Sequence, residues 1–228
     1  MCNDTIILHE FEYKKHRVKI EYEKSQEFFN PREWDNLGTM ICRWNGYTLG
    51  DEQTRLSVEE YFMDKLHENH WKTLPNKILD DYESYNEIVL TLEEILEKLE
   101  SFGWVILPLY IYEHGGITMS TSSFSCPWDS GLGGFIFASR ETTLKEYSRK
   151  NMSKKLRELV EKVLRSEVST YDDYLRGDIY WYGIYDENDD LVESCGGFYD
   201  DYFKNFPYMS EETKSIIDHI TEREMATS

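Results

Sequence analysis

The stretch Y-I-Y-E-H-G-G-I-T-M-S-T-S-S-F-S-C-P-W-D-S-G-L-G-G-F-I-F, from Tyr110 to Phe137, decides how the chain is organised. Its two ends are apolar and predict strands, whereas its centre is rich in Gly, Ser, His, Cys, Trp and Asp. Rigid strands that present a tightly turned polar loop are a common setting for binding and catalysis. We therefore expect the functional site in the loop between His114 and Gly131.

The sequence on either side of this stretch predicts further strands paired in hairpins. Apolar and polar residues alternate around polar turns, and Asn45-Gly46 is the strongest short hairpin-turn dipeptide in the chain. Pro108 interrupts an otherwise apolar segment, which argues for an edge position or a bulge there. The predicted strands are 5–13, 18–23, 37–44, 47–49, 104–112, 134–138, 178–185 and 191–195.

Helices are predicted from apolar spacing and from residues typical of helix ends. Ser57 with Glu60 forms a capping box, Thr91 caps a second helix and Gly103 ends it. The predicted helices are 58–68, 92–102, 143–147, 153–177 and one that begins at Ser210. These patterns predict an α+β fold, with a mainly antiparallel sheet and packed helices in a single domain over 1–228 and a variable insertion at 69–87.

The composition is strongly acidic, with 44 Asp and Glu against 25 Lys and Arg and a formal net charge of −19 over 228 residues. The chain therefore lacks the basic footprint of a nucleic-acid-binding protein, and an anionic membrane surface would repel it. We expect neither direct nucleic-acid binding nor membrane association. The remaining partners are a basic protein surface, a metal ion or a neutral small molecule, although net charge also serves solubility alone.

Cysteine usage and hydropathy indicate a cytoplasmic protein with reduced thiols. The four cysteines, Cys2, Cys42, Cys126 and Cys195, are widely spaced and form no C-x-x-C pair, so a zinc ribbon is not expected. No signal peptide opens the sequence, and no apolar stretch approaches the roughly 20 residues that a membrane span needs.

Three residues of the central loop have the chemistry of nucleophilic catalysis. A thiol such as Cys126 needs a base such as His114, and that base needs an orienting acid such as Asp129. The alternative is a polar loop in which these groups bond the backbone and the thiol is buried. Cys126-Pro127-Trp128-Asp129-Ser130-Gly131 also reads as a plain turn, so both interpretations stay open.

Further polar and aromatic residues are candidates for ligand binding. They are Trp34, Asp35, Asn36, Thr39, Asp51, Ser120, Trp128 and Ser130. A hard cation could be bound by the carboxylates of Glu113, Asp35, Asp51 and Asp129, but no spacing enforces such a site, and we expect neither a metal nor another cofactor. Gly131-x-Gly133-Gly134 does not match a phosphate-binding glycine loop, and 186–197 lacks the Gly and Glu of a calcium-binding loop.

Two charged segments stand out. The acidic run from Asp172 to Asp201 would form a surface that mimics nucleic acid and occupies a basic channel, or simply a solvated face. The candidates for this surface are Asp186, Glu187, Asp189, Asp190, Asp200 and Asp201. The first half of the long helix is locally basic, which we interpret as a solvated face.

Several motifs resemble those of a family of uncharacterised proteins from phages and other mobile elements of bacteria and archaea. They are P-R-E-W-D-N-L-G-T-M at 31–40, Y-x-L-G-D at 47–51, H-G-G-I-T-M-S-T-S-S-F-S-C-P-W-D-S-G at 114–131, Y-L-R-G-D at 174–178 and S-C-G-G-F-Y-D-D at 194–201. The resemblance covers most of the chain but not 69–87. Where the family has Gln-Val after D-S-G, this chain has Leu132-Gly133, so an amide contact is not expected there.

The resemblance implies a setting rather than a mechanism, because small acidic phage proteins often act against host defence. The leading hypothesis is a non-catalytic inhibitor that engages the basic surface of a host defence protein in the host cytoplasm. The alternative is an enzyme, or a protein that binds a nucleotide-like small molecule, built on the loop from His114 to Gly131. In that case Trp34, Trp44 and Trp128 would stack a base.

Overall fold

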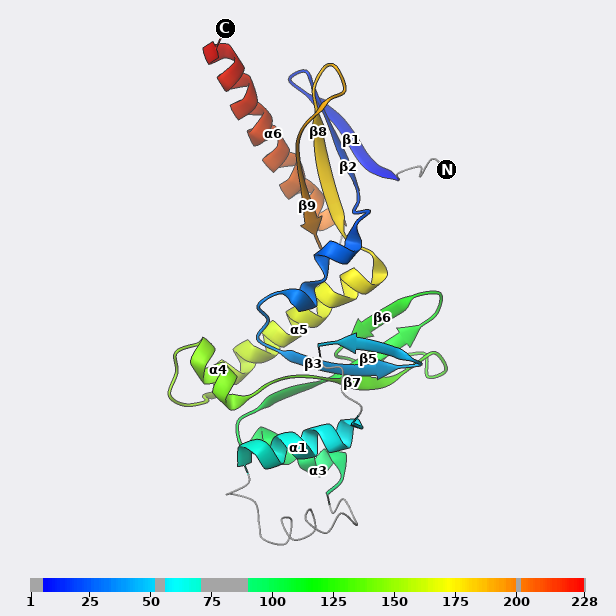
Figure 1. The fold of residues 1–228 in the computed structure, drawn as a ribbon, viewed down its shortest axis with the longest axis vertical. Coiled ribbons are helices and arrows are strands. Elements are labelled where there is room, and N and C mark those ends of the chain that lie inside the picture. The colour runs from blue at the N-terminus through cyan, green and yellow to red at the C-terminus, as the bar shows by residue number, and fades with distance from the viewer. Residues whose placement is uncertain (1–5, 52–55, 71–89, 200–201, 228) are drawn as a thin grey trace. The chain divides into compact units, whose positions relative to one another are not determined.

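The structure is a computed structural model that describes residues 6–51, 56–70, 90–199 and 202–227. It confirms the α+β class and the antiparallel strand pairing, but divides the strands between two sheets (Figure 1). The chain forms two compact units, one made of 1–34, 115–118 and 169–228 and the other of 35–114 and 119–168.

The five-stranded sheet has the order β4-β3-β7-β5-β6. Its strands are β3 (Thr39–Trp44), β4 (Tyr47–Gly50), β5 (Val105–Glu113), β6 (Ile117–Ser120) and β7 (Ser130–Ala138). The predicted Asn45-Gly46 turn joins β3 to β4, and both residues have positive φ angles, of 42° and 89°. Such φ values belong to the hairpin turn that matches the twist of the flanking strands.

Two details of this sheet differ from the prediction. The segment expected to be one loop from His114 to Gly131 contains the short strand β6. In addition, β5 is not an edge strand, because it lies between β7 and β6. The bulge, which was the other expectation for Pro108, is confirmed: the register of β5 and β7 shifts between Leu109 and Tyr110, one residue beyond the proline.

Helices cover both faces of the five-stranded sheet, with α1 (Val58–His70) and α3 (Leu92–Ser101) on one face and α5 (Lys154–Arg176) on the other (Figure 1). The α1/α3 face is an aromatic core in which Phe62 meets Phe135 and Phe137 with ring centroids 5.5 and 5.4 Å apart. The buried residues of α5 recur about every four positions and include Leu156, Val160, Leu164 and Val168. The short helix α4 (Arg140–Glu146) precedes α5.

The predicted helix ends are confirmed by their hydrogen bonds. In the box before α1, Glu60 N–H donates to Ser57 Oγ, and Ser57 N–H donates to the Glu60 carboxylate. Thr91 and Glu94 form the same reciprocal pair at the start of α3. Gly103 follows α3 with φ of 97°, a left-handed conformation that glycine adopts without a steric cost.

The four-stranded sheet has the order β1-β2-β8-β9 and packs against the last helix, α6 (Tyr202–Thr227). Its strands are β1 (Ile7–Tyr13), β2 (His16–Tyr22), β8 (Tyr180–Tyr185) and β9 (Leu191–Phe198). Short 3₁₀ helices at Gln26–Phe29 and Pro31–Glu33 follow β2. The core of this unit is formed by Val18, Ile20, Tyr180, Tyr182, Ile184, Met209 and Ile217.

The predicted start of the last helix is wrong. Ser210 lies inside α6, which begins at Tyr202 and contains Pro207 in its second turn. A proline this near the helix start removes a backbone hydrogen bond without ending the helix, and Met209 and Ile217 then anchor α6 on the sheet.

Some predictions lie outside the described residues, namely most of the insertion at 69–87 and the acidic pair Asp200 and Asp201. Asn69 and His70 belong to the end of α1. Among the described helices, none combines the length and the apolar character that crossing a lipid bilayer requires.

Candidate functional site

Three segments meet at one end of the five-stranded sheet, which we call the loop end: the β3–β4 turn at 44–47, the end of β5 at 112–114 and the loop 121–129. Glu113 holds them together, because its Oε2 accepts hydrogen bonds of 2.8 Å from Trp44 Nε1 and from Asn45 Nδ2. The backbone N–H of Glu113 also donates to the carbonyl of Asp129, at 2.8 Å. The loop end is therefore fixed by the sheet that carries it.

The three candidate catalytic residues do come together at the loop end. The Oδ2 atom of Asp129 lies 3.7 Å from Cys126 Sγ and 3.5 Å from His114 Nδ1. Ser130 Oγ donates to the carbonyl of Cys126 and so fixes the same turn. The carboxylate thus stands between the thiol and the imidazole.

This order differs from the order that thiol catalysis needs, in which the base lies between the nucleophile and the acid. A carboxylate is a poor base for a thiol. The His114 side chain is 74% exposed, so water competes for its hydrogen bonds. The arrangement is well suited to holding the turn at 126–130 in one shape.

The other thiol of this unit offers no nucleophile either. Cys42 is fully buried in β3, and burial raises the pKa of its thiol to about 12. At neutral pH it is protonated and out of reach of solvent. Its sulfur lies close to β7, because a Cβ on Gly133 would stand 3.0 Å from it.

A substitution at Cys126 separates the two interpretations of the loop. We expect Cys126→Ser to change the free energy of unfolding by less than about 0.5 kcal/mol, because a hydroxyl can also donate to Asp129. We also expect it to leave the protein's biological activity unchanged. The measurements are urea unfolding and an assay of the protein's biological activity. Loss of activity with unchanged stability would instead identify Cys126 as a nucleophile.

Several ligand-binding candidates prove to have structural contacts. Asp51 closes the β3–β4 hairpin: its Oδ2 accepts from Met40 N–H at 2.7 Å and its own N–H donates to the Met40 carbonyl. Ser120 Oγ accepts from Ser122 N–H at 3.0 Å. Thr39 is the first residue of β3, while Asp35 is exposed and Asn36 half-buried just before it.

Trp34 belongs to the unit that contains the four-stranded sheet. Its ring meets Tyr199 edge-on, with centroids 5.3 Å apart, and Tyr199 in turn donates to the carbonyl of Phe29. Phe29 lies against Gly196 and Gly197 of β9. Trp34 and the residues Gly196, Gly197 and Tyr199 of the motif at 194–201 are therefore parts of one cluster around Phe29 in that unit.

Glu167 on α5 belongs to the unit that contains the five-stranded sheet, and the sequence analysis missed it. Its carboxylate accepts from Leu37 N–H at 2.8 Å and from Gly38 N–H at 3.2 Å. A Cβ on Gly38 would stand 2.5 Å from Leu164, so this backbone lies directly on the helix. Glu167 thereby fixes the D-N-L-G part of the motif at 31–40. The sequence feature that could have identified Glu167 is an acidic residue next to Leu164 and Val168, which belong to the buried apolar stripe of α5.

The acidic candidates at the β8–β9 turn are partly neutralised by their own unit. Asp186 accepts from the backbone N–H groups of Asp190 and Asn188, which lowers the pKa of its carboxyl. Lys15 lies 3.3 Å from Glu187, and Arg17 pairs with Asp189. The described part of this acidic surface is therefore a braced turn with two of its charges already paired.

The most exposed large side chain of the loop end is Trp128, at 91%. The loop that carries it is anchored from within, because the ring of Phe124 packs against Tyr112 with centroids 5.6 Å apart. Tyr47, in the neighbouring β3–β4 turn, is also exposed, at 48%. An indole held in solvent by a rigid loop has no role in the core of this unit.

Among the residues that the structure describes, no cluster of three or more His, Cys, Asp or Glu side chains is arranged to hold a metal ion. Comparisons of the chain with protein-family models, with curated proteins and with solved structures found no match.

Proposed function

We propose that the protein is a non-catalytic binding protein that docks a basic surface of another protein through its loop end. The observation that carries this proposal is Trp128, a 91% exposed indole on a loop braced by the sheet. Tryptophan is the residue most enriched among those that dominate binding energy at protein interfaces. Because the loop is already ordered, little conformational entropy is lost when it binds.

The charges around this indole favour a cationic partner. Asp129 lies next to Trp128 in the chain, and the carboxylate of Glu113 accepts from the neutral donors of Trp44 and Asn45. A Lys or Arg of the partner that stacks on the indole would also be attracted by these carboxylates. The net charge of −19 would steer such a partner toward the molecule.

The setting implied by the sequence motifs makes the partner a host defence protein with a basic, nucleic-acid-handling surface. Occupying that surface would block it without any chemical step. The acidic turn at 186–190 is a weaker docking site than the loop end, because two of its carboxylates are paired with Lys15 and Arg17. In the described part of the chain, neither Glu113 nor Asp129 of the loop end is paired with a Lys or an Arg.

The test is the affinity of Trp128→Ala for its partner. The partner is first captured from host lysate with the wild-type protein and identified by mass spectrometry, and its dissociation constant is then measured by titration calorimetry. We expect Trp128→Ala to weaken binding about 30-fold, the size of an interface hot spot, with stability unchanged. Wild-type affinity should also fall as salt rises.

A matched control removes another exposed aromatic ring. Phe28, in the other compact unit, is 78% exposed, and Phe28→Ala should leave the affinity at the wild-type value. Equal binding by wild type and Trp128→Ala, or an affinity that does not depend on salt, would contradict the proposal.

One observation favours the alternative function of an enzyme or a nucleotide-binding protein. The thiol of Cys126 and the imidazole of His114 share one carboxylate oxygen, so the groups needed for acid–base work do lie in one place. The Cys126→Ser experiment distinguishes this alternative, because a docking surface tolerates that change and a nucleophile does not.

A further inference from the structure

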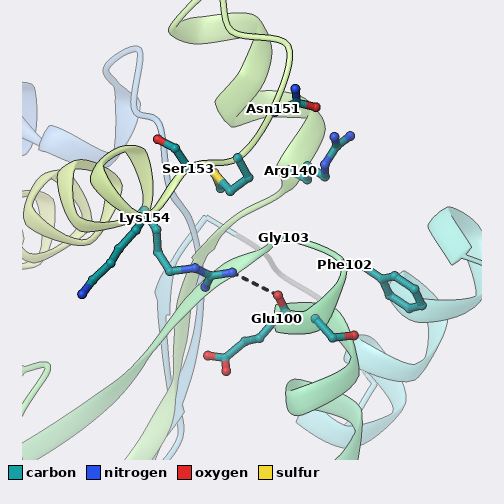
Figure 2. A pocket seen from close by; sticks show the side chains of 10 residues that line it. Glu100, Phe102, Gly103, Arg140, Asn151, Ser153 and Lys154 are labelled. Atoms are coloured by element: carbon teal, nitrogen blue, oxygen red, sulfur yellow. Dashed lines mark hydrogen bonds between the residues drawn. The ribbon is translucent and has the colours of Figure 1, made fainter.

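A cleft of about 320 Å³ lies in the unit that contains the five-stranded sheet, where the end of α3 meets the starts of α4 and α5 (Figure 2). Arg140, Asn151 and Ser153 line one side of it, and Gly103 and Glu100 line the other. Its lining is mostly polar, and Arg157 of α5 completes it. None of these residues belongs to the loop end, so the cleft is a separate feature.

The cleft sits in a locally basic part of an acidic chain. Residues 140–165 carry nine Lys and Arg and four Asp and Glu, although the whole chain has a net charge of −19. Arg140, Lys154 and Arg157 line the cleft against one acidic residue, Glu100. Lys154 extends away from it in Figure 2, toward Glu158 at 3.9 Å, so the two arginines are the cations that face a ligand.

Arg157 is held in place by hydrogen bonds before any ligand binds. Arg157 donates to the carbonyls of Trp104 at 2.8 Å and Glu100 at 3.0 Å, and the second bond is the dashed line in Figure 2. A guanidinium has five N–H donors, so the two carbonyls leave others to serve a ligand. The stem of Arg140 lies over Gly103, where a Cβ would stand 3.0 Å from Arg140 Cδ.

We propose that this cleft binds a phosphate group. Arginine guanidinium groups match the geometry of phosphate oxygens, and the Ser153 hydroxyl and the Asn151 amide add neutral donors at the rim. Ser153 Oγ accepts from Leu156 N–H, which leaves its own hydrogen to donate. The distant acidic residues oppose binding only weakly, because charges are screened over about 8 Å at physiological salt.

The test is calorimetric titration of the full chain with sodium phosphate, against sodium chloride of equal ionic strength. We expect wild type to bind phosphate with a dissociation constant on the order of 1 mM. Arg140→Ala should weaken binding about tenfold, which corresponds to the loss of one charged contact. Lys162→Ala removes the same charge from an exposed position of α5 outside the cleft and should bind like wild type.

A second titration with AMP identifies the source of the phosphate. AMP that binds more tightly than inorganic phosphate, and loses affinity in Arg140→Ala, assigns the cleft to a nucleotide; equal affinities assign it to the free ion. The proposal is overturned if wild type binds neither ligand, or if Arg140→Ala and Lys162→Ala weaken binding equally. Either result leaves the docking role of the loop end untouched.

Discussion

Gly134→Ala is expected to destabilise the protein by at least about 4 kcal/mol, or to prevent folding altogether. A Cβ on Gly134 would stand 1.9 Å from the carbonyl oxygen of Ile41 and 2.8 Å from Cys42 Cα. Both are backbone atoms of β3, the strand that pairs with β7 at this point, so neither can rotate away as a side chain would. Relieving this steric clash requires β3 and β7 to separate.

Urea unfolding of Gly134→Ala measures this effect, and Gly116→Ala is the matched control. A Cβ on Gly116 would meet nothing within 4 Å, and its φ is not in the left-handed region. The control should therefore unfold within about 0.5 kcal/mol of wild type. A wild-type unfolding midpoint for Gly134→Ala would show that β3 and β7 do not approach as closely as described.

The role of Gly134 also explains the glycine cluster at 131–134. Gly131 makes room for the ring of Trp44, and Gly133 makes room for Ile111 and Cys42. The pattern Gly131-x-Gly133-Gly134 has a packing role in β7. Its glycines let β7 pass between β3 and β5 at the bulge beside Pro108.

The parts of the fold that the sequence predicts are those fixed by near neighbours in the chain. The Asn45-Gly46 turn and the boxes at Ser57 and Thr91 depend on contacts within three residues. The long helix was placed to within one residue at each end, because its apolar stripe repeats over 23 residues. Such features depend on residues that are close together in the chain, so a single sequence is enough to predict them.

The parts that could not be predicted depend on distant pairings. Nothing local says that β2 pairs with β8, about 160 residues away, while β3 pairs with β7, so the division into two sheets was missed. The start of α6 at Tyr202 rather than Ser210 also depends on packing, because the contacts of α6 with the four-stranded sheet outweigh the hydrogen bond that Pro207 removes.

The candidate site shows the same division. His114, Cys126 and Asp129 lie close in sequence, and pairing of β5 with β7 closes the chain between them, so their proximity was predictable. Their order, with the carboxylate in the middle, was not predictable, because it depends on how the turn at 126–130 folds back. Glu167 was missed because its partners, Leu37 and Gly38, lie about 130 residues away.

Glu167→Ala is expected to lower the free energy of unfolding by about 3 kcal/mol. The substitution leaves the N–H groups of Leu37 and Gly38 without their carboxylate acceptor, in a segment packed against Leu164. Leaving donors of this kind unpaired costs about 1 to 3 kcal/mol, and hydrogen bonds to a charged acceptor are at the upper end. Thermal or urea unfolding measures the loss.

Two further variants show whether the loss comes from these hydrogen bonds. Glu167→Gln keeps one oxygen acceptor and should recover about half of the stability, whereas Glu158→Ala removes a carboxylate from an exposed position of α5 and should cost less than about 0.5 kcal/mol. If Glu167→Ala and Glu158→Ala are equally stable, the carboxylate does not hold the D-N-L-G segment. That segment would then owe its place to the contact of Gly38 with Leu164 and Ile136, and Gly38→Ala would be the damaging change.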